Sequence, residues 1–504
     1  MIVGKHLIAG EWVDSDSTYR SEPHGGIGRE YAQGRVSDVN SAAELAAEAF
    51  KSYCRSDSRS RSELLERIAS LIENRRSEII KICCDETGLT EDRVTGEFNR
   101  TVNQLQYFAK TLLQENYLDR RRDEALPDRT PQPKPELRLI QRPIGPVAVF
   151  GASNFPLAFS TAGGDTAAAL AAGCPVVVKG HSAHPGTADC VAQCIDEALK
   201  QSRIHSGVFS QIQSNTFTAG QTLVQHPAIK AVGFTGSTLG GRHLFNLCAA
   251  RPDPIPFYGE LGSVNPVFVL PGALSENSQR IAREWIQSLS IGAGQMCTNP
   301  GMLVLLSDGA GGTNSVIEQF LDSVKDELEG SVEQIMLSDS IAQSYREGHD
   351  RIRDCIDTVV VKQSQCQRRR VTPAVFKCSA ASWLQNDFLS DEVFGPLGLV
   401  VVADSVNEML RLADSLEGQL TCTMQMENGD STLAKQLLDI IEHKAGRIIA
   451  NGFPTGVEVS DAMVHGGPYP ASTNFGATSV GSLSIRRFLR PVCFQNMPES
   501  IYPF

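Results

Sequence analysis

The sequence predicts an α/β protein whose chain winds around two mostly parallel sheets. From residue 146 onward, short apolar runs rich in Val, Ile and Phe alternate with helical stretches. This pattern is typical of parallel sheets covered by helices on both faces. The chain has 504 residues, more than one ordinary core organises, so two or three packed domains are expected. We therefore expect a doubly wound α/β architecture.

The composition narrows the class of protein. Hydrophobic residues make up 41% of the chain, which is ample for large cores and unlike a disordered protein. The formal net charge of −12 opposes binding to a phosphate backbone, so we expect no nucleic-acid partner. The apolar stretches are far shorter than a membrane span, and the N-terminus lacks the pattern of a secretory signal. We expect no membrane partner.

The cysteines indicate a reducing compartment. There are 13 of them, an odd number, scattered along the chain and without a Cys-x-x-Cys pair. A disulfide framework does not fit this usage, so we expect a cytoplasmic protein. Most of the cysteines are expected to be small buried hydrophobes.

The first third is expected to be helical after a β-like opening, LIAGEWV. Residues 41–52 are rich in alanine with charges interspersed, apolar residues recur at helical spacing over 61–79, and a further helix is expected over 91–113. Segment 126–146 holds several prolines, which break helical order and indicate a linker with an extended piece.

A first sheet is expected beyond this linker. Its predicted strands are 146–151, 175–179, 208–213 and 229–234, with helices over 160–172 and 185–200. Parallel sheets bind ligands in the crevice beyond the carboxyl ends of their strands. The residues that follow each strand are therefore candidates for a cofactor site.

A second α/β region is expected to begin near Glu260. Its predicted strands are 265–270, 302–306, 332–337, 396–403 and 446–451, with helices over 279–289 and 314–328 among them. The tail, 482–496, is expected to be extended like the linker.

The familiar nucleotide and metal signatures are absent from the sequence. It contains no G-x-G-x-x-G, no P-loop motif and no G-x-S-x-G elbow. His181 and His184 lie three apart, but no Cys, His or carboxylate cluster completes a metal site, so we expect loop histidines and no metal.

Three polar residues are candidates for chemistry. Cys297 lies in IGAGQMCTNPG, where small residues leave the thiol approachable and nearby backbone N–H groups favour the thiolate. Glu260, in YGELGS, could be a general base with a pKa raised by burial, or a solvated loop carboxylate. Asn154, after a predicted strand, could donate to an oxyanion, or be a turn asparagine ahead of Pro156.

Together these segments resemble a known family. FGASNFP, FTGS, YGELGS, GQMCTNPG and EVFGP occur in the order and approximate spacing of the aldehyde dehydrogenase superfamily, and the resemblance covers essentially the whole chain. It implies an aldehyde dehydrogenase-like fold of two doubly wound α/β domains with a small β oligomerisation arm. The implied boundaries are 1–125 with 147–257 for the cofactor-binding domain, 258–475 for the catalytic domain, and 126–146 with 476–504 for the arm.

The resemblance also implies catalytic roles. Cys297 resembles the nucleophile that forms a thiohemiacetal and then a thioester with the aldehyde. Asn154, with the backbone N–H of Cys297, resembles the oxyanion hole. Glu260 resembles the base that activates the hydrolytic water. His465, in MVHGGP, is expected near the thiol on the subfamily analogy, with a structural role as the alternative.

A nicotinamide cofactor is implied in the same way, as NADP or NAD. Lys179 resembles the ribose-binding lysine, Gly236 and Ser237 the pyrophosphate site, and Glu392 and Phe394 the residues that hold the nicotinamide ribose and ring. NAD-preferring relatives usually carry a glutamate where this chain has Ser182, which leaves room for a 2′-phosphate. The arginine expected of NADP-using relatives is replaced by Phe217, so the preference stays open.

Within the superfamily the sequence resembles the α-ketoglutarate semialdehyde dehydrogenases. Two blocks carry this resemblance, from GPVAVFGASNFP to PVVVKGH and NGFPTGVEVSDAMVHGGPYPAS. The NADP-dependent fatty aldehyde dehydrogenase of luminous bacteria shares both blocks but tends to have tryptophan in place of Phe453. Phe155 and Phe453 are expected to line the substrate site. Arg138, Arg142 and Arg242 are available for a substrate carboxylate, without a basis for choosing among them.

Two alternative functions are weighed against this one, and an oligomer is expected. A catalytically silent cofactor-binding protein is opposed by the three intact catalytic candidates, and a cofactor-free thiol hydrolase by the intact cofactor motifs. The extended segments 126–146 and 482–496 resemble the family's oligomerisation strands, so a homodimer or homotetramer is expected.

Overall fold

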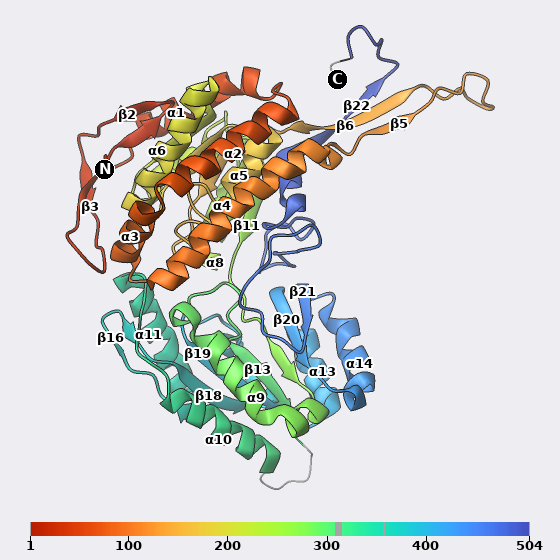
Figure 1. Ribbon diagram of the computed structural model, residues 1–504. Helices are drawn as coiled ribbons and strands as arrows, with labels where there is room; N and C mark the ends of the chain where they lie inside the picture. The colour runs from red at the N-terminus through yellow and green to blue at the C-terminus, as the bar shows by residue number, and fades with distance from the viewer. Residues whose placement is uncertain (1, 308–314, 356–357, 503–504) are drawn as a thin grey trace.

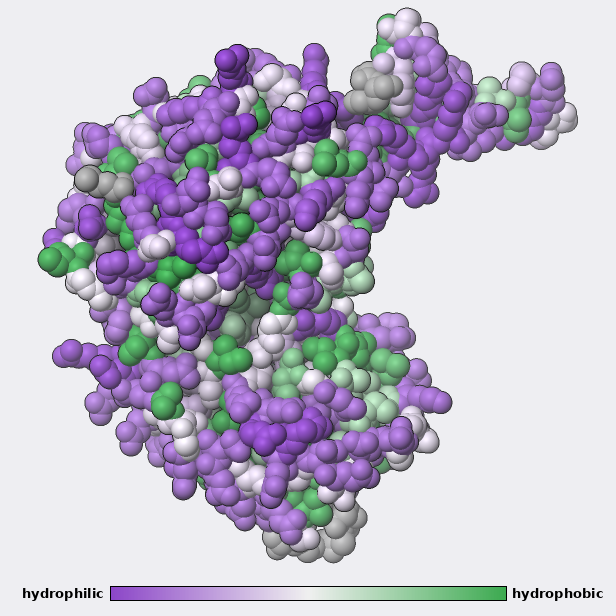
Figure 2. All heavy atoms as spheres, viewed as in Figure 1, coloured by the Kyte–Doolittle hydropathy of each residue, from purple (hydrophilic) through white to green (hydrophobic). Residues whose placement is uncertain are grey.

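The computed structural model describes residues 2–307, 315–355 and 358–502. Figure 1 shows two halves joined by few chain crossings, with a narrow sheet projecting from the first half. Each half is built on a seven-stranded sheet flanked by helices. The α/β class and the two wound parts predicted from the sequence are confirmed. Figure 2 shows that the face in view is mostly hydrophilic, with a hollow between the halves.

The first sheet is parallel in its centre and antiparallel at one edge. Its order is β11 (Phe257–Glu260), β10 (Ala231–Thr235), β7 (Val147–Phe150), β8 (Val176–Lys179), β9 (Phe209–Ile212), β1 (His6–Ile8) and β2 (Glu11–Val13). The five strands from β11 to β9 pair in parallel register, and β1 pairs antiparallel with β9 and β2. Their residues are nearly all buried, which explains the continuous apolar runs in the sequence.

Eight helices among the described residues accompany this sheet. They are α1 (Val36–Tyr53), α2 (Ser58–Asn74), α3 (Arg76–Thr87), α4 (Glu91–Gln114), α5 (Gly164–Ala172), α6 (Pro185–Ser202), α7 (Phe217–Gln225) and α8 (Thr238–Ala249). A short hairpin of β3 (Thr18–Arg20) and β4 (Glu30–Ala32) lies beside them. The single helix predicted over 61–79 is wrong, because the chain breaks at Arg75. Its apolar period continues across the break because α2 and α3 both pack on α6.

The second sheet has the order β15 (Val359–Lys362), β18 (Ala374–Ser379), β19 (Leu397–Ala403), β13 (Met302–Leu306), β12 (Val267–Val269), β20 (Gln419–Gln425) and β21 (Ala445–Ala450). The six strands from β18 to β21 are parallel. The sequence missed β18 and β20. The strand predicted over 332–337 is only β14 (Gln334–Ile335), which lies in a separate small sheet with β17 (Arg370–Val371) and β16 (Cys366–Gln367).

Helices cover this second sheet as well. They are α9 (Pro271–Ser290), α10 (Ser315–Glu329), α11 (Asp339–Arg353), α12 (Ala380–Gln385), α13 (Val406–Ser415) and α14 (Ser431–Ile441). The helix predicted over 314–328 corresponds to α10, although residue 314 itself lies outside the described residues. Short 3₁₀ turns are η1 (Asn116–Leu118), η2 (Ser206–Val208), η4 (Asp387–Leu389) and η5 (Asn428–Asp430).

The projecting sheet joins the linker to the tail. β5 (Arg121–Asp123), β6 (Leu137–Pro143) and β22 (Leu489–Gln495) pair antiparallel and extend away from the first half in Figure 1. The tail is therefore extended only in its second half. Residues before β22 form the 3₁₀ segment η6 (Ser482–Phe488), which packs on α5. No helix in the described ranges is long and apolar enough to cross a membrane.

Candidate active site

A cavity of about 960 Å³ lies between the two halves and collects residues predicted from distant motifs. Its lining includes Asn154, Ser237, Glu260, Cys297 and Glu392. The first three follow or end strands of the first sheet, and the last two come from loops of the second half. The structure therefore brings most of the predicted chemical and cofactor residues to one cleft, whereas Lys179, Ser182 and His465 are not part of its lining.

An unusual backbone turn places the Cys297 loop. After α9 the chain forms η3 (Ile291–Gly294), in which Gly292, Ala293 and Gly294 have φ values of 60°, 57° and 67°. A left-handed backbone costs a side-chain-bearing residue free energy, and glycine avoids that cost. A Cβ on Gly294 would lie 2.3 Å from the carbonyl carbon of Gly395. The glycines in the motif thus let this loop pack against the segment that precedes β19.

Asn265 supports the Cys297 loop through hydrogen bonds, a role that the sequence analysis missed. Its amide nitrogen donates to the carbonyls of Cys297 and Asn299, both at 2.9 Å, and it is fully buried with a φ of 50°. Its oxygen accepts from Ser263 and Thr421, each at 3.0 Å. Asparagine is one of the few residues that adopt this conformation at modest cost. The Asn-Pro pair after YGELGS was the available signal.

Cys297 lies against a buried imidazole and a buried carboxylate. Its sulfur is 3.4 Å from His465 Nε2, and the same nitrogen is 2.6 Å from Glu260 Oε1. The other carboxylate oxygen of Glu260 accepts a short hydrogen bond from the Ser479 hydroxyl. Ser479 and Thr478 in turn bond the backbone of His465. The expected nearness of His465 to the thiol is found, and the supporting Ser479 was not foreseen.

The electrostatics of this cluster correct one expectation. Burial opposes the charge of Glu260, but the neighbouring His465 and the Ser479 hydroxyl prevail and lower its pKa. The predicted rise in the Glu260 pKa is therefore wrong, and the carboxylate is ionised near neutral pH. Burial and the Glu260 charge instead raise the pKa of Cys297 well above its usual range, so the resting group is a thiol.

Asn154 follows β7 and contacts the loop that carries Cys297. Its side-chain nitrogen donates to the carbonyl of Gln295 at 3.0 Å, and only 8% of the residue is exposed. This bond uses one of the two amide hydrogens, which leaves the other for a ligand. Gln295 is itself fixed, because its Oε1 accepts from the Leu337 amide at 3.0 Å. Asn154 is thus a positioned donor at the cavity wall, not a simple turn residue.

Lys179 ends β8 and is half-buried, and burial lowers its pKa to about 8. Ser182 follows in the turn before α6. Close by, Gln213 is fully buried and its Oε1 has no hydrogen-bond partner among the described residues. A cationic donor and an unpartnered acceptor suit a ligand rich in hydroxyl groups. Phe217, the residue where an arginine was looked for, is 86% exposed at the start of α7.

Gly236 and Ser237 lead into the N-terminus of α8. The Ser237 hydroxyl caps this helix by accepting from the Gly240 amide at 3.3 Å. Gly236, Ser237 and Thr238 line the cavity and are exposed to it. The N–H groups of a first helical turn attract anions, so this position suits a phosphate group.

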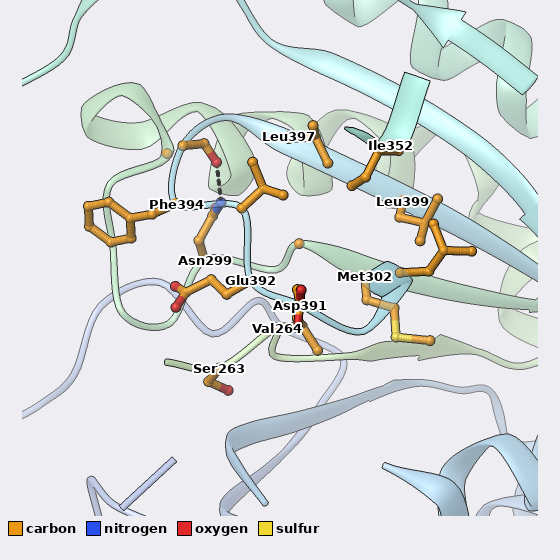
Figure 3. Close-up of a pocket in the computed structure, with 15 residues that line it drawn as sticks. Ser263, Val264, Asn299, Met302, Ile352, Asp391, Glu392, Phe394, Leu397 and Leu399 are labelled. Atoms are coloured by element: carbon orange, nitrogen blue, oxygen red, sulfur yellow. Dashed lines mark hydrogen bonds between the residues drawn. The ribbon is translucent and has the colours of Figure 1, made fainter. Parts of the chain in front are cut away.

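Glu392 and Phe394 line the same cavity and a smaller pocket beside it. Figure 3 shows them at one end of the smaller pocket, with the Phe394 ring turned away from Leu397 and Leu399. Burial raises the pKa of Glu392 to about 8. A Cβ on Gly262 would lie 2.6 Å from Glu392 Oε2, so glycine keeps open the space in front of the carboxylate.

The two aromatic residues expected at the substrate site lie in different packing groups. Phe155 stacks edge-on against Phe159 at a centroid distance of 5.2 Å, and Phe159 lies 6.2 Å from the His465 ring. Phe453 instead packs against the core cluster around Trp285 in the second half. The structure does not bring Phe453 together with Phe155.

The arginines proposed for a substrate carboxylate have other contacts. Arg138 pairs with Glu136 and Glu499 in the arm, Arg142 donates to the Cys54 carbonyl, and Arg242 lies over the Phe245 and Tyr469 rings. None of them appears in the lining of the cavity. Arg100 and Arg447, which the sequence gave no reason to single out, are also outside that lining, but both lie close enough to Cys297 to interact with it electrostatically.

The described residues contain one group of side chains with metal-ligand geometry, and it is the catalytic cluster itself. Ligand atoms of Glu260, Cys297 and His465 all lie within 4.8 Å of one another. Zinc accepts thiolate, imidazole and carboxylate ligands. The expectation that no metal binds therefore stays a prediction.

The chain is similar to known proteins in both sequence and fold. Residues 12–483 match the family described as "Aldehyde dehydrogenase family". An α-ketoglutaric semialdehyde dehydrogenase of Acinetobacter baylyi is 42% identical over 99% of this chain and 95% of its own. α-Ketoglutaric semialdehyde dehydrogenase 2 of Azospirillum brasilense is 45% identical over 92% of this chain and 88% of its own. The solved structure of betaine aldehyde dehydrogenase from Staphylococcus aureus in complex with NAD⁺ superposes with a TM-score of 0.83 at 19% identity, covering 100% and 97% of the two chains.

Proposed function

The chain belongs to the aldehyde dehydrogenase family, and from that premise we propose that it oxidises α-ketoglutarate semialdehyde to 2-oxoglutarate with NAD⁺ or NADP⁺. The observation that carries the chemistry is the meeting of a half-buried thiol, Cys297, with an ionised carboxylate, Glu260, and a positioned amide, Asn154, in one cleft. The names of two relatives above 40% identity support the choice of aldehyde.

In this proposal Cys297 attacks the aldehyde carbon. Its high pKa means that the proton must leave as the carbon–sulfur bond forms. Glu260 is the proton acceptor, because it is ionised and its charge is the largest electrostatic influence on the Cys297 thiol. His465 donates to the carboxylate and fixes its position, while Ser479 holds the other oxygen.

Asn154 stabilises the oxyanion of the thiohemiacetal with its free amide hydrogen, and the backbone N–H of Cys297 is the second donor. Donors fixed before the reaction stabilise developing charge at little reorganisation cost. When bound, the nicotinamide group accepts the two electrons and the hydrogen of the aldehyde C–H bond. Cys297 is then left acylated as a thioester.

After the proton taken from Cys297 has passed to solvent, Glu260 is again ionised and acts in the last step. It takes a proton from a water molecule that attacks the thioester, and the carboxylic acid leaves with regeneration of the thiol. The ionised state of Glu260 suits a proton acceptor at neutral pH. A neutral, protonated carboxyl could not serve this step.

The cofactor would lie along the carboxyl edge of the first sheet. Lys179 and Ser182 would meet the adenosine ribose, Gly236 and Ser237 the pyrophosphate, and Glu392 and Phe394 the nicotinamide ribose and ring. The unpartnered Gln213 oxygen and the open α8 N-terminus fit such a ligand. Because Ser182 carries no charge, this edge does not repel a 2′-phosphate, and both cofactors remain candidates.

The proposal also covers the domain organisation, the assembly and the cellular location of the protein. We assign 1–125 and 147–257 to cofactor binding, 258–475 to catalysis, and 126–146 and 476–504 to an oligomerisation arm. β21 ends the second sheet, and Figure 2 shows hydrophobic residues on that side of the second half. An open sheet edge and a projecting arm favour a homodimer or homotetramer. None of the 13 cysteines, all of which lie in the described ranges, forms a disulfide, which suits the reducing cytoplasm.

Turnover tests the function directly. Purified enzyme is expected to reduce NAD⁺ or NADP⁺, seen as new near-ultraviolet absorbance, with α-ketoglutarate semialdehyde preferred over glutarate semialdehyde and decanal. Cys297→Ala enzyme is the control and should give no signal. If decanal alone is oxidised, the fatty aldehyde reading replaces this one. If no aldehyde yields reduced cofactor, the proposed activity is refuted.

A further inference from the structure

Two arginines near the catalytic sulfur lack an acidic partner. Arg100 donates through Nη1 to the Val457 carbonyl at 2.8 Å, and its Nε and Nη2 are buried without a hydrogen-bond partner in the described part of the chain. Arg447 donates through Nη1 to the Gly456 carbonyl at 3.0 Å, and its Nε is likewise buried and unpartnered. Buried charges are normally paired, because desolvation without a partner is costly. Both guanidiniums therefore call for an anion.

Neighbouring residues place Arg100 beside the catalytic cluster, and they place the strand that carries Arg447 beside the loop after His465. The Arg100 guanidinium lies 5.4 Å from the centroid of Phe159, and the Phe159 ring lies 6.2 Å from that of His465. On the other side, β21 packs closely on the loop after His465, since a Cβ on Gly446 would lie 2.2 Å from the Gly466 carbonyl oxygen. Arg447 is the next residue of that strand.

Residues 454–457 contact both arginines. Carbonyls of the segment 454–457 accept from both, since Pro454 and Gly456 bond Arg447 while Val457 bonds Arg100. In Figure 1 this segment belongs to the blue chain that crosses from β21 back to the side of α4. One helix, α4, and one strand, β21, from opposite halves thus direct positive charge to one wall.

The electrostatics agree with this placement. Burial lowers the pKa of both arginines, and the nearness of Cys297 is the largest of the opposing influences in each case. Arg447 is also affected by the charge of Arg100. By contrast Arg93, on the same face of α4, is neutralised by Glu97 at 2.7 Å. Arg100 and Arg447 form no ion pair among the described residues, although Glu97 and Glu260 act on Arg100 at longer range.

We propose that Arg100 and Arg447 form the binding site for the carboxylate of the substrate, a short 2-oxo acid that carries its aldehyde at the far end. This inference rests on the proposed function. Guanidinium groups match carboxylate geometry, and the unpartnered Nε and Nη2 of Arg100 present two N–H donors of the kind that a carboxylate binds in pairs. An anchored carboxylate orients the aldehyde carbon, four bonds away, toward Cys297. It also gives the site its selectivity, because an uncharged chain leaves both charges buried and unpaired.

The test compares a charged and an uncharged aldehyde of equal chain length. In the wild type and in R100Q and R447Q, kcat/KM is measured for α-ketoglutarate semialdehyde and for pentanal. Each substitution is expected to lower kcat/KM for the semialdehyde by about 30-fold, mostly through KM, as for a buried charge pair. The pentanal value should change by less than about 3-fold. The ratio of the two substrates is read in one preparation, so partial misfolding cancels.

Two further variants sharpen the result. R76Q is the matched control, because Arg76 also contacts an aromatic ring of α4 but is paired with Glu73, and its substrate ratio should equal that of wild type. R100K keeps the charge and should restore most of the ratio. Titration calorimetry of Cys297→Ala enzyme with 2-oxoglutarate should show binding that R100Q and R447Q weaken.

The outcomes separate this inference from the function beneath it. If the wild type shows no preference for the semialdehyde over pentanal, the proposed substrate is wrong. If the wild type shows that preference but R100Q and R447Q retain it, the substrate stands and the arginine site is refuted. Equal losses on both aldehydes would also refute it, because they would assign the arginines a purely structural role.

Discussion

The two seven-stranded sheets present opposite ends to the shared cleft. In the first sheet the functional residues follow the strands, with Asn154 after β7 and Lys179 at the end of β8. In the second sheet they precede the strands, with Cys297 before β13 and Glu392 before β19. The strands of each sheet that border the cleft are parallel, so each set of residues gathers at one edge.

This difference separates two kinds of site. The first edge offers strand ends and a helix N-terminus, which suit a polar ligand held by backbone and short side chains. The second edge offers long loops fixed by buried amides such as Asn265, which suit a nucleophile that must be placed accurately. We therefore expect substitutions of Cys297 and of the residues that support its loop to remove chemistry, and substitution of Lys179 at the first edge to weaken cofactor binding.

Cys297→Ala is expected to show the largest difference between its effect on turnover and its effect on cofactor binding. Loss of the nucleophile should lower kcat by at least about 10³-fold, because no neighbouring group replaces it. Binding of NAD⁺ or NADP⁺, followed by titration calorimetry, should stay within a few-fold of wild type. A large loss of cofactor affinity in this variant would contradict the assignment of separate tasks.

Glu260→Gln, at the end of β11 in the first sheet, is expected to move two properties of the catalytic cluster in opposite directions. Turnover should fall by about 10²- to 10³-fold, because the proton acceptor is lost. The Glu260 charge raises the pKa of Cys297, so its removal should lower that pKa and speed alkylation by iodoacetamide at pH 7.5. In the wild type, the alkylation rate should keep rising beyond pH 9. Slower alkylation in the variant would show that Glu260 favours the thiolate instead.

Asn265 tests whether the loop before β13 needs its amide support. Asn265→Ala removes bonds to the Cys297 and Asn299 carbonyls, so the free energy of unfolding should fall by about 2 to 4 kcal/mol. We expect kcat to fall by roughly 30-fold, because a displaced nucleophile loses its reaction geometry.

Asn265→Gly is the matched control for the same position. It also lacks the amide but accepts the φ of 50° without strain. Denaturant titration should show it to be more stable than Asn265→Ala by about 1 kcal/mol, while both lose a similar fraction of kcat. Wild-type turnover in either variant would show that the loop holds its shape without this residue.

The same difference explains how far the sequence could be interpreted. The rule that ligands lie beyond carboxyl ends applies to the first sheet, so strand predictions alone pointed toward Asn154 and Lys179. It does not apply to the second sheet, where only the motif resemblance identified Cys297. His465 lies 168 residues from Cys297, and no local pattern connects them.

The missed strands have a physical explanation. β20 reads QLTCTMQ, which is not a hydrophobic run, yet all of it is buried. Its polar side chains are satisfied by the loops it supports, since Gln419 accepts from the Val264 and Asn265 amides and Thr421 donates to Asn265. Hydrophobic periodicity cannot detect a strand whose burial depends on such partners. Arg100 and Arg447 escaped notice for the same reason, because only the fold shows which charges lack a partner.

The mildest effect is expected at the first edge, from Lys179→Met. The methionine keeps the apolar stem but removes the donor, so KM for the cofactor should rise by about 10-fold while kcat and the iodoacetamide rate of Cys297 stay near wild type. Burial lowers the pKa of Lys179 to about 8, so the amine is charged below that pH and neutral above it. Wild-type KM for the cofactor should therefore rise between pH 7 and 9, as the charged donor is lost, whereas the variant should show no such rise. A variant that loses thiol reactivity along with cofactor affinity would indicate that the two edges are coupled, and the division between them would fail.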